Sequence, residues 1–131
     1  MVNINKNSTP RVKIIQKLYS KSLNPEEKIT YTKSQYKKFI KDVTEGTIER
    51  KELIEETIVK FLKSDIDFKR TDKLLKIIIC AAVFELLFKH NNPKKVIISE
   101  YLKTSQFFLE RAQIKYLNAV LDKLSDLIRK N

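Results

Sequence analysis

The apolar residues of the chain recur every three or four positions, which is the spacing of amphipathic helices. The first such stretch begins after Thr9, a good N-cap, with Pro10 suited to the first helical position. The dipeptide Asn24-Pro25 is expected to end this helix. Its apolar face is made of Val12, Ile15, Leu18 and Tyr19.

A second helical region is predicted between residues 32 and 62. Thr32 and Gln35 match a capping box, so we place its start at Thr32. Gly46 is expected to kink or end this helix. The apolar positions from residue 48 to residue 62 then continue in helical register.

The second half of the chain predicts three further helices. The block from Thr71 to His90 is apolar nearly all round its middle, which is typical of a central, buried helix. Asn92 and Pro93 are interpreted as the N-cap and first residue of the next helix. A last helix is expected from Glu110 to Arg129. With one glycine and three prolines in 131 residues, little material remains for hairpins, so the predicted fold class is all-α, in one domain.

The charge adds a partner class to this picture. The chain carries 27 Lys and Arg against 16 Asp and Glu, a net charge of +11. Such a balance favours a polyanion, either nucleic acid or an anionic membrane surface, with a merely solvated lysine-rich surface as the alternative. Because the apolar positions form seams that need helical partners, a bundle is favoured over a membrane-surface helix.

Membrane insertion and export are not expected. The longest apolar stretch, Leu74 to Phe88, is interrupted by Lys76 and Glu85 and falls short of the ~20 residues of a membrane span. Met1 to Pro10 is polar, so we expect no signal peptide and a cytoplasmic protein.

The residue types needed for catalysis are scarce. A single glycine, Gly46, excludes the glycine-rich loops that bind nucleotide phosphates. The one histidine, His90, has no orienting motif, and the one cysteine, Cys80, lies in an apolar run typical of a buried structural thiol. No zinc ligand set exists. We therefore predict a protein that is not an enzyme and that needs no metal or cofactor.

Several motifs resemble the NusB family. Phe84-Glu85-Leu86-Leu87 resembles its Tyr-Glu-Leu-Leu, and the segment from Pro93 to Tyr101 resembles its P-x-K-V-x-I-N-E. The segment from Lys115 to Lys123 is similar to K-F-V-N-G-V-L-D-K, and that from Ile14 to Ser20 to A-x-Q-A-L-Y-S. The motifs stand in the family's order, over roughly residues 11–129. The chain departs from the family in its few basic N-terminal residues, in Cys80 where an arginine is expected, and in Ala119 where glycine is expected.

The resemblance implies a fold and a function. It implies a helical, RNA-binding domain of two small packed bundles over residues 10–131, after a flexible N-terminus at 1–9. It also implies binding to the boxA element of nascent ribosomal RNA, together with the ribosomal protein NusE, in a complex that makes RNA polymerase resist termination. No cofactor is implied, and a homodimer is left open. The alternative is a helical protein-interaction module that has lost RNA binding. An accessory domain of an RNA methyltransferase is less favoured, since 131 residues leave no room for the methyltransferase itself.

The candidate RNA-binding residues lie at the start of the first helix and on the last two helices. Cationic side chains would neutralise phosphates, two tyrosines would stack on bases, and a glutamine would contact a base or sugar edge. Single-stranded RNA suits this set because its unpaired bases reach aromatic rings. Each residue also has an ordinary alternative, in packing or in a solvated surface. The predicted set is Arg11, Lys13, Gln16, Tyr19, Lys94, Lys95, Lys115 and Tyr116.

Overall fold

The computed structural model describes residues 9–62 and 68–130, and within them it contains six α-helices, one short 3-10 helix and no strand. This confirms the all-α class. The predicted flexible segment, residues 1–9, lies outside the described residues except for Thr9. The helices are α1 (Pro10–Leu23), α2 (Lys37–Glu49), α3 (Lys51–Leu62), η2 (Phe68–Arg70), α4 (Lys73–Phe88), α5 (Lys94–Ser105) and α6 (Arg111–Ile128).

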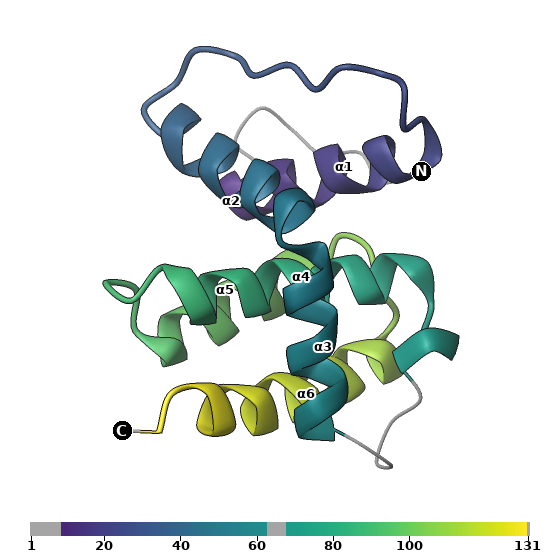
Figure 1. Ribbon diagram of the computed structural model, residues 1–131, viewed down its shortest axis with the longest axis vertical. Helices are drawn as coiled ribbons and strands as arrows, with labels where there is room; N and C mark the ends of the chain where they lie inside the picture. Colours follow the sequence, from purple (N-terminus) through teal and green to yellow (C-terminus); the bar gives the residue numbers. More distant parts are fainter. Residues whose placement is uncertain (1–8, 63–67, 131) are drawn as a thin grey trace.

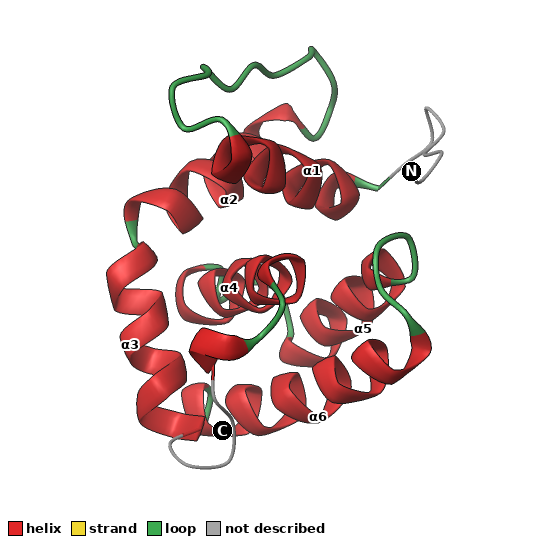
Figure 2. Cartoon of the chain, turned by 90° about the vertical axis from the view of Figure 1, so that its right-hand side faces the viewer, coloured by secondary structure: helices red, strands yellow, loops and turns green. Residues whose placement is uncertain are grey.

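The helices pack in two groups that meet at α4 (Figure 1). Helices α1 and α2 lie side by side on one side of α4, and α5 and α6 pack together on the other. Helix α3 leaves the end of α2 and runs along the flank of the molecule towards α6 (Figure 2). This arrangement confirms the expectation of two small packed bundles.

Helix α4 is the central element of the core, as the sequence predicted. Every residue from Ile78 to Leu86 is buried. Because this stretch is apolar on nearly every side, it has no face suited to water and must be covered all round. Helices of both groups supply that cover.

The helix ends follow from local chemistry where caps are present. The Thr9 hydroxyl accepts a hydrogen bond from the Val12 amide, with Pro10 as the first helical residue, as predicted. At the start of α6, Glu110 and Gln113 form a reciprocal capping box, and the helix runs to Ile128, within one residue of the predicted ends at each side.

The predicted start of the second helix at Thr32 is wrong. Helix α2 begins at Lys37, and residues 24–36 form an irregular connection that arches over α1 (Figure 1). This connection offers few apolar side chains for a helical face. One of them, Tyr31, donates a hydrogen bond at 2.5 Å to the Glu45 carboxylate on α2 and so packs against the next helix from outside it.

Gly46 does not end α2, which was one of the two outcomes expected for it. The helix continues to Glu49, and the break falls at Arg50, so residues 48–62 are not one helix. Gly46 has a packing role: a Cβ atom there would lie 2.3 Å from two carbons of the Phe84 ring. Glycine therefore lets the aromatic ring of α4 approach the backbone of α2.

The start of α5 is displaced by one residue from the prediction. Pro93 is the N-cap and the helix begins at Lys94. The predicted cap, Asn92, donates its side-chain amide to the Glu85 carboxylate at 3.3 Å instead. The Asn92 side chain, which the sequence pattern assigned to a helix cap, thus serves as a hydrogen-bond donor to the buried charge of Glu85.

Leu86→Ala is expected to lower the free energy of unfolding by about 2–5 kcal/mol, because it opens a cavity at a fully buried position. The matched control is Leu53→Ala on α3, whose side chain is 44% exposed and which should change stability by less than about 0.5 kcal/mol. Urea denaturation followed by circular dichroism measures both. Equal losses in the two variants would contradict the packing described above.

Candidate nucleic-acid interface

Arg11, the first predicted phosphate ligand, is buried in an internal ion pair. Its guanidinium donates two hydrogen bonds to the Glu85 carboxylate, at 2.9 and 2.7 Å, and its residue is only 9% exposed. A second carboxylate, on Glu100, lies 3.8 Å away. The charge of Arg11 is thus already matched inside the protein, and we leave Arg11 out of the proposed RNA surface.

Aromatic side chains enclose this pair. The Tyr101 hydroxyl donates to Glu85 at 2.5 Å, and the Arg11 guanidinium lies 5.0 Å from the centre of the Phe39 ring. Burial acts to lower the pKa of Arg11, but the hydrogen bond and the charge of Glu85 outweigh it and hold the pKa above its ordinary value. Burial, reinforced by Glu85, raises the pKa of Tyr101 well above its usual value. Both partners of Glu85 therefore keep their protons at neutral pH.

The outward face of α1 carries a row of lysines. Lys13, Lys17 and Lys21 follow one another at four-residue intervals, which places them on one side of the helix about 6 Å apart. Helix α1 contains no aspartate or glutamate. Within the described part of the chain none of the three makes an ion pair. No carboxylate of the described residues therefore neutralises this row.

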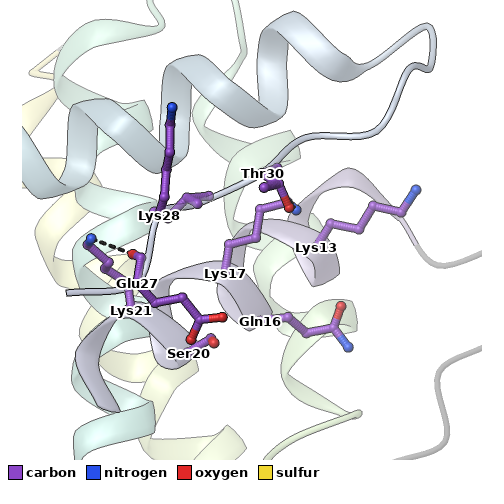
Figure 3. A pocket seen from close by; sticks show the side chains of 9 residues that line it. Lys13, Gln16, Lys17, Ser20, Lys21, Glu27, Lys28 and Thr30 are labelled. Carbon is purple, nitrogen blue, oxygen red and sulfur yellow. Dashed lines mark hydrogen bonds between the residues drawn. The ribbon is translucent and has the colours of Figure 1, made fainter. Parts of the chain in front are cut away.

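This lysine row borders a cleft between α1 and residues 24–36 (Figure 3). The cleft has a volume of about 250 Å³. The ammonium groups of Lys17 and Lys21 donate to backbone carbonyls of the facing segment, those of Thr30 and Glu27, each at 2.7 Å. The other lining residues are Lys13, Gln16, Ser20, Lys28 and Ile29.

A polar stripe separates the lysine row from Tyr19. On a helix, Gln16 lies about 60° round from Lys13, and Tyr19 about 60° further in the same direction. The Gln16 amide makes no hydrogen bond within residues 9–62 and 68–130. The Tyr19 side chain is 37% exposed. One helix therefore presents cations, a hydrogen-bonding amide and an aromatic ring in sequence round its surface.

Tyr19 borders a second hollow, of about 380 Å³, on the other side of α1. The hollow is formed with the start of α4 and the start of α6, and it includes Phe108 and Gln113. Lys73, at the first position of α4, supplies a cation there. The carboxylates of Asp72 and Glu110 also line the hollow, so its walls combine an aromatic ring, a carboxamide, one cation and two acidic groups.

Lys94, a predicted residue of α5, lies apart from Tyr19. Lys94 forms an ion pair with Asp126 at 2.9 Å, near the end of α6, whereas Tyr19 adjoins Gln113 near its start. About 20 Å of helix separates Gln113 from Asp126. Lys95 and Lys115 are exposed, and Tyr116 is half-buried and packs against the core. The structure brings Lys13, Gln16 and Tyr19 together on α1 but does not unite the whole predicted set.

Some lining residues were not predicted. Lys17 and Lys21 could have been found, because the four-residue lysine repeat is visible in the sequence. Lys28, Phe108 and Gln113 carry no such signal. Their position beside α1 depends on tertiary packing.

The remaining chemistry gives no second candidate. Burial raises the pKa of the Cys80 thiol to about 12, with a smaller contribution from Glu55, so the thiol is protonated at neutral pH. His90 is exposed just beyond the end of α4. In the described ranges no cluster of three potential metal ligands occurs, and no helix among them is both long and apolar enough to cross a bilayer.

Comparison with known proteins identifies relatives. The model of the NusB family matches residues 1–126. The transcription antitermination protein NusB of Mesorhizobium japonicum is 36% identical over 84 residues, 64% of this chain and 54% of that protein. Its counterpart in Rhizobium etli is 31% identical over 100 residues, 76% of this chain and 62% of that protein. The chain thus spans between 54% and 62% of the length of these two curated relatives.

A solved structure of NusB from T. maritima shares the fold. It superimposes with a TM-score of 0.76 over 93% of both chains, at 19% sequence identity. At that identity the likeness concerns the helix arrangement alone.

Glu85→Gln is expected to lower the free energy of unfolding by about 3–5 kcal/mol, since it leaves the buried Arg11 guanidinium without its hydrogen-bonded carboxylate. The matched control is Asp126→Asn, which breaks the exposed pair with Lys94 and should cost less than about 1 kcal/mol. Denaturant unfolding measures both losses.

A double-mutant cycle isolates the interaction. Arg11→Met should cost less in the Glu85→Gln background than in the wild type, because the ion pair is already broken there. Strict additivity of the two losses would show that Arg11 and Glu85 do not stabilise each other.

Proposed function

Because the chain belongs to the NusB family, we propose that it is a transcription antitermination factor that binds single-stranded RNA. The names of the related proteins support antitermination. The net charge of +11 supports a polyanionic ligand. On this proposal the domain of residues 10–131 acts by binding RNA and protein partners, with no catalytic step.

The observation that carries the proposal is the outward face of α1. Its lysines have no carboxylate partners within the described residues. An aspartate or glutamate elsewhere on α1 could have paired with them, but the helix contains neither. Like charges four residues apart destabilise a helix by about 0.2–0.5 kcal/mol per pair. A phosphate group that approaches Lys13 and Lys17 would turn this repulsion into attraction.

The order of side chains round α1 suits a single strand of RNA. Phosphates would contact Lys13, the Gln16 amide would reach a base or sugar edge, and an unpaired base would stack on Tyr19. A duplex cannot place its bases in this way, because they are paired and stacked within it. Lys95, Lys115 and Tyr116 would extend the contact over the far helices.

The finer proposal concerns partners. We propose that the RNA is a boxA-like element of nascent ribosomal RNA, and that a NusE-like ribosomal protein binds beside it within an RNA polymerase antitermination complex. Apolar side chains on the α5 side support a protein contact: Val96 is 48% exposed and Phe107, in the turn after α5, is 41% exposed. A partner protein that covers these side chains would remove their apolar surface from water, which favours docking. The same residues suit a homodimer.

Tyr19→Ala is expected to weaken binding of a boxA-like RNA by about tenfold or more, because stacking on one tyrosine contributes ~1–3 kcal/mol. The slope of affinity against salt should stay the same, since no phosphate contact is lost. Lys13→Gln should instead lower that slope by about 0.7. Fluorescence anisotropy over a series of salt concentrations, with the NusE-like protein present and absent, measures both quantities.

A control at an exposed apolar residue outside the proposed site is Leu53→Ala on α3, whose side chain is 44% exposed and which should leave affinity unchanged. If neither Tyr19→Ala nor Lys13→Gln alters binding, the RNA site lies elsewhere. If the wild-type protein shows no preference for the boxA-like RNA over a scrambled one, the protein-interaction module without RNA recognition replaces the proposal.

Val96→Asp is expected to abolish co-elution with a purified NusE-like protein at micromolar concentration, because it places a charge in an apolar contact. The control is Val59→Asp on α3, at a valine that is 50% exposed, which should co-elute like the wild type. Size-exclusion chromatography in moderate salt separates the complex from its parts. Retained binding by Val96→Asp would move the partner surface away from α5.

A further inference from the structure

The segment of residues 24–36, which we call the strap, runs back along α1 without regular structure before α2 begins. It has to cover this distance because α1 and α2 are parallel: Arg11 at the start of α1 lies 5.0 Å from the centre of the Phe39 ring near the start of α2. Long irregular connections in compact domains are commonly binding loops. The strap forms one wall of the cleft beside α1, and α1 forms the other.

Four contacts tie the strap in place. Lys21 donates to the carbonyl of Glu27, and Lys17 donates to that of Thr30 while its ammonium group lies 5.1 Å from the centre of the Tyr31 ring. The Tyr31 hydroxyl then bonds to Glu45 on α2. The strap is therefore a built wall held by side chains from both helices.

These ties divide the lysines of the cleft into two kinds. Lys17 and Lys21 already bond to the strap, and the pKa of Lys17 is lowered by burial and then by its neighbour Lys13. Lys13 on α1 and Lys28 on the strap make no hydrogen bond or ion pair within the described residues, and their side chains extend outward at separate points of the cleft rim (Figure 3). Two cations without partners thus remain, one from each wall.

Hydrogen-bonding groups lie between these cations. Gln16 and Ser20 line the same cleft, and neither side chain has a hydrogen-bond partner in the described part of the chain. Among the described residues that line the cleft, Glu27 is the one acidic residue. A ligand that matches the cleft would therefore be an anion that carries more than one negative charge and several oxygen acceptors.

We propose that the cleft between α1 and the strap holds the sugar-phosphate backbone of single-stranded RNA, with Lys13 and Lys28 contacting separate phosphates. This inference rests on the proposed function and adds the strap to its site. Gln16 and Ser20 contact the sugars between the phosphates. The strand then leaves the cleft past Gln16, with its bases directed towards Tyr19.

The decisive variant is Lys28→Gln, because Lys28 belongs to the strap and bonds to neither helix. It should lower the slope of log affinity against log salt by about 0.7, and weaken binding about fivefold at 0.1 M salt. Lys13→Gln combined with Lys28→Gln should double the change in slope. The matched controls are Lys41→Gln and Lys51→Gln, at exposed lysines on α2 and α3, which should leave the slope unchanged.

Lysine footprinting tests the contact without a variant. A labelled single-stranded boxA-like RNA should protect Lys13 and Lys28 from acetylation at least threefold, and should leave Lys41 and Lys51 reactive, as read by mass spectrometry. Inorganic tripolyphosphate serves as the second probe. Protection by tripolyphosphate equal to that by RNA, at equal phosphate concentration, would make the cleft a site for free anions and overturn the RNA assignment.

The outcomes separate this inference from the proposed function. RNA binding by the wild type with no protection of Lys28 and no change of slope would overturn the cleft proposal and leave the RNA-binding function standing. Absence of RNA binding by the wild type, with and without a NusE-like protein, would overturn both.

Discussion

The carboxylate of Glu85 is a charge buried at the centre of the molecule, and the structure compensates it from three directions. Arg11 reaches it from α1, Tyr101 from α5 and Asn92 from the connection between α4 and α5. An unpaired buried charge costs several kcal/mol, so these elements are held to one geometry rather than to any arrangement that buries apolar surface. The start of α1 is thereby fixed against α4 and α5. The orientation of its outward face follows from that contact.

The same turn of α4 also receives the other end of the chain. The Arg129 guanidinium, just after α6, donates to backbone carbonyls in the last turn of α4 and in the connection that follows it. The accepting residues are Glu85, Leu86, Lys89 and Asn92. Arg11, in the first helix, and Arg129, just after the last, therefore both contact the last turn of α4. Helices α1 and α6 are thus both positioned by polar contacts with α4 as well as by apolar packing.

Periodicity predicted the parts of this fold that local sequence determines. The predicted bounds of α1, α4 and α6 lie within one or two residues of the observed ends, because each helix has a clear apolar pattern and capping residues. The strap was misread, because Thr32 and Gln35 satisfy a capping pattern while the bond from Tyr31 to Glu45 lies outside any local window. Of the proposed RNA surface, the sequence predicted Lys13, Gln16 and Tyr19 on α1. Residues that join it from the strap and from α6 are brought there by tertiary packing, which no spacing in one chain reveals.

Arg11 and Lys13 show why positive charge alone does not locate such a surface. They lie two residues apart in sequence, and both look like phosphate ligands at the start of a helix. On the helix they are about 200° apart, so one must face inward if the other faces outward. Glu85, 74 residues away from Arg11 in the sequence, determines that Arg11 is the one that faces inward. The inward arginine anchors α1, and the outward lysine is left with a free charge at the cleft. On the proposed function, folding and RNA binding use neighbouring cations on opposite faces of one helix, and the anchoring of Arg11 sets the position of Lys13.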